Sequence, residues 1–424
     1  MTMDRSASAF AADTLTNTAD PAWSESGIPI NGSHGNSPFI LLTGATGFLG
    51  QYLLRDLIKA GAQVAVIVRS GTQVSARERI RQALNRWRED LAGNNSEVVV
   101  LPGDVTKPHL GLSWTARKWV RKHCCSLVHN AASVNFAPAE RDREPWITNL
   151  RGTEQVLRFC LDHDIHDLHH VSTAYVCGVR EGLIRESELA CGQSFRNPYE
   201  ASKCEAEQLV QTFDLIGNRT IYRPSIITGD SRTGETCTYH GMMWYLRLFD
   251  LLIPQQPLNA RGRHQTDIVL PIDGDEPHDV VNVDWVSNAM VRLIKNPAAR
   301  NRVFHVTASQ PTTIRQVVDY CCEYYNSEGV VYAGRHAGRH ATSDFADLVF
   351  RMAQAYHGYE QSAPQFDRSQ LLEFLPHDQS PVIDRDMVFR FIEFGRRDRW
   401  GKQRRQWTRQ PASFEPTVRL ALVE

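Results

Sequence analysis

The chain has 424 residues, of which 42% are hydrophobic and 22% are charged, and its formal net charge is -1. This is the composition of an ordinary globular protein, long enough for one large domain or two to three smaller ones. A near-neutral chain is not drawn as a whole to nucleic acid, so we predict no nucleic-acid partner. Nine cysteines without Cys-x-x-Cys spacing indicate reduced thiols in the cytoplasm rather than a disulfide framework.

Two stretches bear on targeting. Residues 1–37 are rich in Ser, Ala, Asn and Gly, which predicts a disordered leader rather than a secretory signal. The longest apolar stretch, Met242–Ile253, is short and contains Arg247 and Asp250. We therefore expect a cytoplasmic protein with no transmembrane segment.

From residue 38 onward, short apolar runs alternate with segments of helical spacing. Strands are expected at Phe39–Leu42, Val64–Val68, Val98–Leu101, Ser126–His129, Leu168–Ser172 and Thr220–Arg223. Helices are expected at Phe48–Ala60, Ser75–Leu91, Thr148–Asp162 and Tyr199–Phe213. This alternation predicts the α/β class, with a doubly wound parallel sheet in a domain over residues 38–230.

The alternation loosens after residue 230. Residues 231–410 are expected to form a smaller α/β substrate lobe with a helical C-terminal extension, and one apolar helix lies within residues 231–278. Further elements are expected at Val280–Asn282, Trp285–Ile294, Phe304–Val306 and Thr313–Tyr325. Their pattern indicates that parts of residues 280–310 return to the sheet domain.

Glycines follow the first expected strand with the spacing G-x-x-G-x-x-G. At such a strand-to-helix turn, the first glycine permits a tight turn, the second lets the backbone approach a pyrophosphate, and the third lets the helix pack on the strand. The cofactor-binding residues expected here are Gly44, Thr46, Gly47, Phe48, Leu49 and Gly50. An ordinary tight turn is the alternative, but the position at the first turn of the fold favours dinucleotide binding.

The end of the second expected strand selects the cofactor. Folds that bind NAD(H) place Asp or Glu there for the ribose 2′-hydroxyl, whereas a 2′-phosphate needs a cation. Here Arg69 and Ser70 occupy that place, and Arg77 or Arg79 follows. A guanidinium can hold a phosphate through two parallel hydrogen bonds, so we predict NADP(H), with a solvated arginine as the alternative interpretation.

Tyr199 and Lys203 are four residues apart on an expected helix, which places them on one face. An ammonium and an oxidised nicotinamide both lower the pKa of a phenol towards neutrality. Thr173, at the end of the preceding strand, can hydrogen-bond the same substrate oxygen and stabilise developing negative charge. Alone, these residues would be a surface pair and a strand-end cap; together they predict a catalytic set.

Several motifs occur together in one order. They are Gly44–Gly50, Gly103-Asp104-Val105, Asn130-Ala131-Ala132, Asn149-x-x-Gly152-Thr153, Ser172-Thr173-x-x-Val176, Tyr199-x-x-x-Lys203 and Arg223-Pro224-Ser225. In this order they resemble the extended short-chain dehydrogenase/reductases, a superfamily with the Rossmann fold. Further segments are similar to its thioester-reductase and fatty acyl-CoA reductase branch, namely Val66–Arg69 with Ala76–Arg79, Ile227–Gly234 and Asp279–Asp284.

The resemblance implies a role for each motif. Thr173, Tyr199 and Lys203 would form the catalytic triad, and Asn149 would support a proton relay. The implied cofactor contacts outside the glycine turn are Arg69 and Arg79, then Asp104 and Val105 near the adenine, Asn130 and Ala131 near the nicotinamide ribose, Tyr199 and Lys203, and Pro224 and Ser225 at the nicotinamide. One departure is Cys204, which stands where this branch often has an aromatic residue.

By this resemblance we expect an NADP(H)-dependent reductase of an acyl thioester, delivered by coenzyme A or an acyl-carrier protein and reduced to an aldehyde or alcohol in lipid metabolism. No adenylation or carrier domain precedes the reductase motifs, so the thioester is expected to come from another molecule. Two alternatives stay open. One is an alcohol, ketone, steroid or sugar-type carbonyl oxidoreductase with the same triad, and the other is a non-catalytic NADP-sensing binding protein.

Three other features have two interpretations each. An acyl channel or a plain core helix would explain Met242, Met243, Trp244, Leu248 and Leu251. The stretch from Arg396 to Arg409 holds seven cations, one acid and two tryptophans, which suits an acidic carrier protein, peripheral membrane contact or a solvated helix end. Strand alternation separates the four histidines, so we predict no metal site from His163, His166, His169 and His170.

Overall fold

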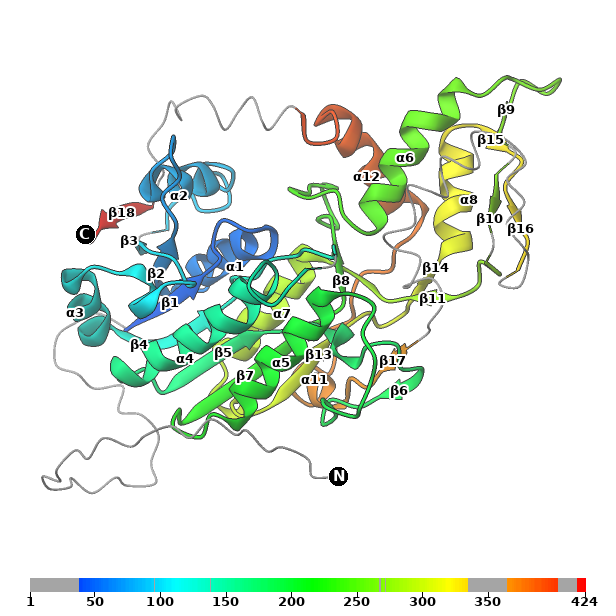
Figure 1. Cartoon of the computed structure of the whole chain (residues 1–424). Coiled ribbons are helices and arrows are strands. Elements are labelled where there is room, and N and C mark those ends of the chain that lie inside the picture. Colours follow the sequence, from blue (N-terminus) through cyan, green and yellow to red (C-terminus); the bar gives the residue numbers. More distant parts are fainter. Residues whose placement is uncertain are drawn as a thin grey trace, which may run out of the picture. The chain divides into compact units, whose positions relative to one another are not determined.

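The computed structural model describes residues 38–94, 96–137, 139–266, 268–270, 272–334, 364–402 and 418–424. Its centre is an eight-stranded sheet with entirely parallel pairing and the order β13-β7-β5-β4-β1-β2-β3-β18 (Figure 1). The strands are β1 (Phe39–Thr43), β2 (Gln63–Val68), β3 (Glu97–Pro102), β4 (Cys124–His129), β5 (Asp167–Val171), β7 (Asn218–Pro224), β13 (Val303–Val306) and β18 (Arg419–Leu422). The predicted α/β class with a doubly wound parallel sheet is confirmed.

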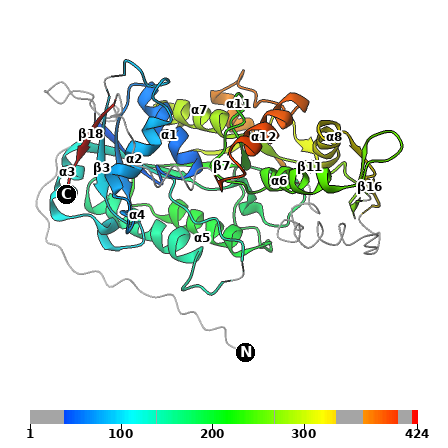
Figure 2. The ribbon, with the colours of Figure 1, turned by 90° about the horizontal axis from the view of Figure 1, so that it is seen from above.

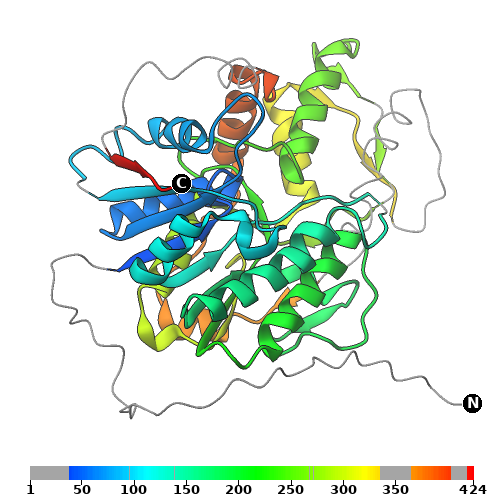
Figure 3. The same ribbon diagram turned by 60° about the vertical axis from the view of Figure 1, so that its left-hand side comes forward.

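Helices cover both faces of this sheet (Figures 2 and 3). One face carries α1 (Phe48–Lys59), α2 (Ala76–Asn85), α7 (Val283–Ile294) and α11 (Ser369–Phe374), and the other carries α3 (Trp114–His123), α4 (Gly152–Asp162) and α5 (Pro198–Thr212). Along the strands, Leu42 and Val66 pack towards the first group, whereas Leu41 and Ile67 pack towards the second. Because side chains alternate across a strand, a sheet covered on both faces requires such continuous apolar runs.

The sheet domain contains two elements that the sequence pattern does not predict. Helix α3 buries Ala116 and Val120 alone, so its apolar period is weak. Strand β18 is four residues long and pairs with β3 at the sheet edge, far away in sequence. The helix expected as far as Leu91 ends instead at Asn85, after which the Trp87 N–H bonds a carbonyl three residues back rather than four.

Helices α6 (Met242–Leu252), α8 (Ile314–Tyr324) and α12 (Arg385–Arg397) share a separate hydrophobic cluster. Short parallel pairs are β8 (Ile226–Thr228) with β12 (Val280–Asn282), β9 (His264–Gln265) with β15 (Ser327–Glu328), β10 (Val269–Leu270) with β16 (Val331–Tyr332), and β6 (Gly182–Ile184) with β17 (Pro364–Phe366). An antiparallel pair joins β11 (Pro277–His278) and β14 (Thr312–Thr313).

The predicted domain limits are only partly visible in these elements. As expected for residues 280–310, α7 packs on α1 and β13 joins the large sheet. Contacts group residues 37–424 into one unit, so the division at residue 230 stays a prediction. The leader over residues 1–37 and the basic stretch over residues 403–409, with Trp407, lie outside the described residues.

A buried ion pair holds α5 to the sheet. Arg223 on β7 and Glu207 on α5 are 2.6 Å apart, and neither side chain is exposed. Glu207 also accepts a hydrogen bond from the Ser172 hydroxyl at 2.6 Å, and Arg223 donates to the Glu186 carbonyl at 3.2 Å. This pair therefore fixes α5, the helix that carries Tyr199, against the end of β5.

Replacing Glu207 by glutamine tests this role. Arg223 would stay buried without a countercharge, so Glu207→Gln is expected to lower the free energy of unfolding by about 3–5 kcal/mol in urea titrations. The matched control is Glu205→Gln on the same helix, which removes a solvent-facing pair with Arg141 and is expected to cost at most about 1 kcal/mol. Equal losses in the two variants would contradict the prediction.

Candidate active site

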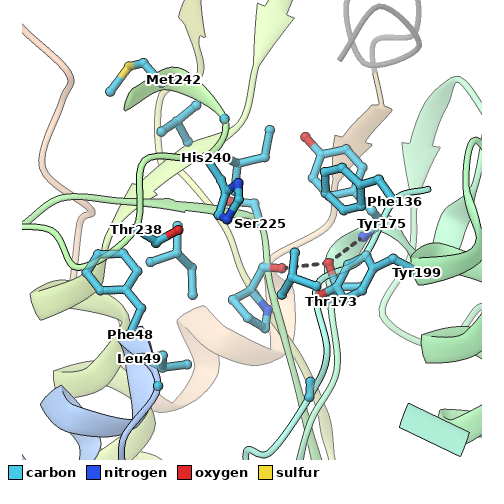
Figure 4. Close-up of a pocket in the computed structure, with 18 of the residues that line it drawn as sticks. Phe48, Leu49, Phe136, Thr173, Tyr175, Tyr199, Ser225, Thr238, His240 and Met242 are labelled. Carbon is cyan, nitrogen blue, oxygen red and sulfur yellow. Dashed lines mark hydrogen bonds between the residues drawn. The ribbon is translucent and has the colours of Figure 1, made fainter. Parts of the chain in front are cut away.

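The predicted site residues converge on one cavity of about 780 Å³, at the carboxyl ends of the central strands (Figure 4). The predicted residues that line it are Gly44, Thr46, Gly47, Phe48, Leu49, Arg69, Arg79, Val105, Asn130, Ala131, Thr173, Tyr199, Lys203, Pro224 and Ser225. Gly50, Asp104 and Asn149 do not belong to the wall. The phenol of the predicted triad therefore shares a cavity with the first glycine turn, as the enzymatic interpretation requires.

The glycine turn after β1 has the close contacts that its spacing predicts. Gly44 has a φ of +73°, and a Cβ there would lie 2.7 Å from the backbone nitrogen of Ala131. A Cβ at Gly50 would lie 1.9 Å from the Gly44 carbonyl oxygen, so Gly50 permits the close packing of the turn and does not itself line the cavity. Helix α1 begins at Phe48 with Gly47 as its N-cap, and both residues line the cavity. A helix N-terminus at this place favours a bound phosphate.

Two arginines lie at the end of β2. Arg79 donates to the Arg69 carbonyl at 2.7 Å and to the Thr46 hydroxyl at 3.1 Å, which ties α2 to the glycine turn. Burial and the neighbouring Arg69 charge lower the pKa of Arg79. Arg77 is exposed and does not line the cavity, so the choice between Arg77 and Arg79 falls on Arg79. None of the described residues in the cavity wall is Asp or Glu.

Tyr199 and Thr173 lie together in the wall (Figure 4). The Thr173 hydroxyl donates to the Pro224 carbonyl at 3.4 Å and accepts from the Tyr175 N–H at 3.3 Å. Burial raises the pKa of Tyr199 to about 12, against the opposing effect of a hydrogen bond with Thr173. The Tyr199 phenol is therefore protonated at neutral pH and able to donate.

Lys203 is held at the end of β5, where its Nζ donates to the Val171 carbonyl at 2.7 Å. Burial lowers the pKa of Lys203 to about 8, and the charge of Glu207 opposes this. We expected Lys203 to lower the pKa of Tyr199. Burial of the phenol dominates instead and raises the pKa of Tyr199, so the contribution of Lys203 stays a prediction.

Asp104 and Asn149, the two predicted polar residues that do not line the cavity, form hydrogen bonds outside it. The Asp104 carboxylate accepts from the Thr106 N–H at 3.0 Å and from its hydroxyl at 2.8 Å, which shapes the loop after β3. Asn149 is 1% exposed, and its amide donates to the Ser133 carbonyl at 3.1 Å and to the Ser202 hydroxyl at 3.0 Å. The adenine contact of Asp104 and the relay role of Asn149 stay predictions.

Part of the cavity is apolar, and we call it the apolar wall. It consists of Met242, Tyr245 and Phe249 on α6, Ile268, Val269, Leu270 and Ile272 around β10, and Ile314, Val317 and Val318 on α8. Of the five α6 residues considered for an acyl channel, Met242 alone belongs to it. Met243 packs in the cluster with α8 and α12, Trp244 and Leu248 form another cluster, and Leu251 is exposed. The helical repeat explains this, because the third and seventh residues after Met242 share its face.

Residues between the main helices and strands complete the wall, and the sequence patterns do not single them out. They are Phe136, Tyr175, Thr238 and His240 (Figure 4). The Phe136 ring lies 5.7 Å from the Tyr199 ring, measured between centroids, and covers one side of the phenol. An aromatic residue several positions after a strand is the only signal that could have pointed to Phe136.

Comparison with known proteins agrees with this geometry. The profile of the family described as male sterility protein matches residues 42–290, which is more than half of the chain. The chain belongs to this family. The resemblance to extended short-chain dehydrogenase/reductases of the thioester-reductase branch is thereby confirmed, and with it an NAD(P)-binding reductase fold.

Some similar curated proteins, whose names state an activity, are much longer than this chain. One component of the linear gramicidin synthase of Brevibacillus parabrevis is 28% identical over 285 residues, which are 66% of this chain and 5% of that protein. The L-2-aminoadipate reductase large subunit of Penicillium chrysogenum is 30% identical over 226 residues, 48% of this chain and 16% of that protein. The chain thus spans a small part of these curated relatives.

Solved structures match over most of their own length. The terminal R domain of the myxalamid PKS-NRPS pathway superposes with a TM-score of 0.67 at 26% identity, covering 86% of this chain and 92% of that one. A thiolation-reductase di-domain from an archaeal non-ribosomal peptide synthetase gives 0.65 at 21% identity, covering 86% and 76%. The second likeness concerns the fold alone.

Two structural features are absent from the described residues. None of their helices is both long and apolar enough to cross a membrane. No three His, Cys, Asp or Glu side chains among them gather as metal ligands would. The four neighbouring histidines have separate surroundings: His163 bonds the Phe159 carbonyl at 2.9 Å and His169 bonds the Tyr222 hydroxyl at 3.0 Å, while His166 is exposed.

The close approach of Gly50 to the Gly44 carbonyl leads to a prediction. Gly50→Ala would place a methyl group 1.9 Å from the Gly44 carbonyl, so the turn must shift, and NADPH affinity measured by fluorescence titration is expected to fall at least about tenfold. Gly217→Ala is the control, since its Cβ meets no atom closer than 3.4 Å. Wild-type affinity in Gly50→Ala would show that this contact does not shape the cofactor site.

Proposed function

We propose that this chain is a cytoplasmic, NADPH-dependent reductase of acyl thioesters. The observation that carries the proposal is the shared cavity, whose wall holds the Tyr199–Thr173 pair, two arginines and a large apolar surface. The names of similar structures support it, because they are reductase domains of peptide and polyketide synthases, one of them joined to a thiolation domain. The thioester would be carried by coenzyme A or by an acyl-carrier protein.

The wall fits NADPH better than NADH. Gly44, Gly47 and the start of α1 suit a pyrophosphate, and the guanidinium groups of Arg69 and Arg79 suit a 2′-phosphate. A carboxylate that would hold a ribose 2′-hydroxyl is lacking among the described lining residues. When bound, NADPH supplies the hydride.

The residues around the carbonyl divide the remaining work. When substrate binds, the Thr173 hydroxyl turns from the Pro224 carbonyl, so that it and the Tyr199 hydroxyl both donate hydrogen bonds to the thioester carbonyl oxygen. These bonds stabilise the negative charge that develops there as the carbonyl carbon is reduced. Collapse breaks the carbon–sulfur bond, the thiolate leaves and takes up a proton, and an aldehyde forms. A second hydride, with a proton from Tyr199, converts the aldehyde to an alcohol. With a pKa of about 12, the Tyr199 phenol is protonated at neutral pH and has a proton to donate.

The apolar wall favours a neutral, largely apolar acyl chain. Its side chains come from α6, β10 and α8 and include Met242 and Phe249, whose shapes accommodate hydrocarbon. A fatty acyl chain is the simplest substrate of this kind, which would place the enzyme in lipid metabolism. A ketone or alcohol oxidoreductase would use the same triad, so the substrate must be tested directly.

The activity assay follows NADPH oxidation with acyl-CoA, acyl-carrier protein and simple ketones. Tyr199→Phe removes the proton donor and is expected to lower kcat/KM for the thioester by about 10²–10⁴-fold while leaving NADPH binding in place. Tyr320→Phe, on α8 but outside the cavity wall, is the control. Oxidation with ketones alone would refute thioester reduction, and an unchanged rate in Tyr199→Phe would refute Tyr199 as the proton donor. A cellular phenotype that Tyr199→Phe leaves unchanged would favour a sensing protein.

Cofactor choice is tested at the two arginines. Each of Arg69→Ala and Arg79→Ala is expected to raise the Kd for NADPH by about 10–100-fold, because a charged hydrogen bond to the 2′-phosphate is lost, and to leave the Kd for NADH nearly unchanged. Arg77→Ala is the control, because Arg77 is exposed and outside the cavity. Equal effects on both cofactors would argue against a 2′-phosphate site.

A further inference from the structure

A chain of buried hydrogen bonds begins at the end of β1, directly before the glycine turn. The Thr43 hydroxyl accepts from the N–H groups of Asn130 and Ala131, each at 3.1 Å. Its oxygen also lies 2.9 Å from Nδ1 of His129. A hydroxyl has two lone pairs and one proton. Because both lone pairs receive N–H groups, the Thr43 proton points to His129 Nδ1, which must accept it.

This assignment fixes the other side of the His129 ring. With Nδ1 unprotonated, a neutral ring carries its proton on Nε2, which lies 3.1 Å from the Thr153 hydroxyl oxygen. The Thr153 hydroxyl in turn donates to the Asn149 carbonyl at 2.6 Å, since a carbonyl can only accept. Every proton from Thr43 to Asn149 therefore has a defined place.

The chain continues to the helix of the phenol. The Asn149 side-chain amide donates to the Ser202 hydroxyl at 3.0 Å, and that hydroxyl donates to the Tyr199 carbonyl at 2.9 Å. The linking side chains are buried at 2% exposure or less, namely those of Thr43, His129, Asn149, Thr153 and Ser202. Buried polar groups are costly to leave unpaired, so the whole chain holds its members in one geometry.

We propose that His129 is a positioning residue: as the neutral tautomer with its proton on Nε2, it couples the glycine turn to the first turn of the Tyr199 helix. On one side it directs the Thr43 hydroxyl, and so holds the backbone of Asn130 and Ala131 at the cavity wall. On the other side it orients Thr153 and, through it, Asn149. The inference rests on the proposed function, in which cofactor and substrate meet between these two places.

A charged ring would break the chain. Both nitrogens of an imidazolium donate, and the Thr43 oxygen has no lone pair left to receive a second ring proton. Burial lowers the pKa of His129 to about 3, and the Lys203 charge adds to the effect. The titratable groups that face the ring are Lys203 and His170, whose ring centroid is 5.5 Å away. Lys203 disfavours protonation of His129 because it is cationic, and His170, whose own pKa is lowered by burial, supplies no countercharge.

The tautomer can be measured without any ligand. Histidine-selective ¹⁵N labelling of the full chain, with the signal assigned by its loss in His129→Asn, reports which ring nitrogen carries the proton. The expected result is a protonated Nε2, an unprotonated Nδ1 and no change between about pH 5 and pH 8. A proton on Nδ1, or titration within that range, would overturn the proposal without any kinetic measurement.

Variants separate the two sides of the ring. His129→Phe removes both bonds and is expected to raise the Kd for NADPH about tenfold. His129→Asn keeps an acceptor near the Nδ1 position, so its Kd is expected to stay within about threefold of wild type. Both variants lose the bond to Thr153 and are expected to lower kcat with the thioester about 3- to 10-fold.

The matched controls are His169→Phe and His169→Asn. His169 is buried in the neighbouring strand β5 and bonds Tyr222, so these variants should lose stability while keeping kcat and the Kd for NADPH. Equal Kd values for His129→Phe and His129→Asn, or wild-type kinetics in both, would reduce His129 to a structural role. Absence of thioester reduction would refute the proposed function alone, because NADPH binding and the ¹⁵N signals still test His129.

Discussion

The site depends on how closely the ends of β1 and β4 approach each other. At β1 the strand order reverses, with β2 and β3 on one side and β4, β5 and β7 on the other. Helices leave such a reversal towards opposite faces, so a crevice opens at the carboxyl ends of the two strands. Gly44 lies against the backbone of Ala131 there, with no space for a Cβ. The Thr43 hydroxyl bonds the same strand end, so sterics and hydrogen bonding fix one contact.

Around this contact, two buried carboxylates form ion pairs outside the cavity wall. Glu207 bonds Arg223 at 2.6 Å, and Glu200, next to Tyr199, lies 3.2 Å from Arg196. Because these carboxylates lie outside the wall, the charged side chains that line the cavity are cations. Among the described lining residues, no Asp or Glu would repel a bound phosphate. The same burial keeps the Tyr199 phenol protonated by raising its pKa to about 12. Local desolvation thus determines the protonation state needed for reduction.

The sequence predicts well what depends on local patterns. The parallel strands, the glycine turn and the association of Thr173 with Tyr199 follow from apolar runs, glycine spacing and motif order, and the structure brings these residues together. Other features depend on partners distant in sequence. Strand β18 forms only because β3 offers a free edge, and the direction of the Tyr199 pKa shift depends on burial by the Phe136 loop and other segments. No spacing rule contains that information.

The position of the apolar wall also depends on partners that are distant in sequence. Packing on α8 and α12 decides which face of α6 meets the cavity. Asp250 anchors α6 in this orientation, because its carboxylate accepts hydrogen bonds from the Trp400 indole at 2.6 Å and the Tyr325 hydroxyl at 3.0 Å. These partners lie beyond residue 290, where the match to the family ends. In the proposed function, the hydride chemistry would therefore depend on strand ends of the sheet, whereas the acyl chain would be selected by helices that pack in a separate cluster. Under that proposal, substitutions on α6 would change the preference for chain length while Tyr199 and the glycine turn keep their geometry.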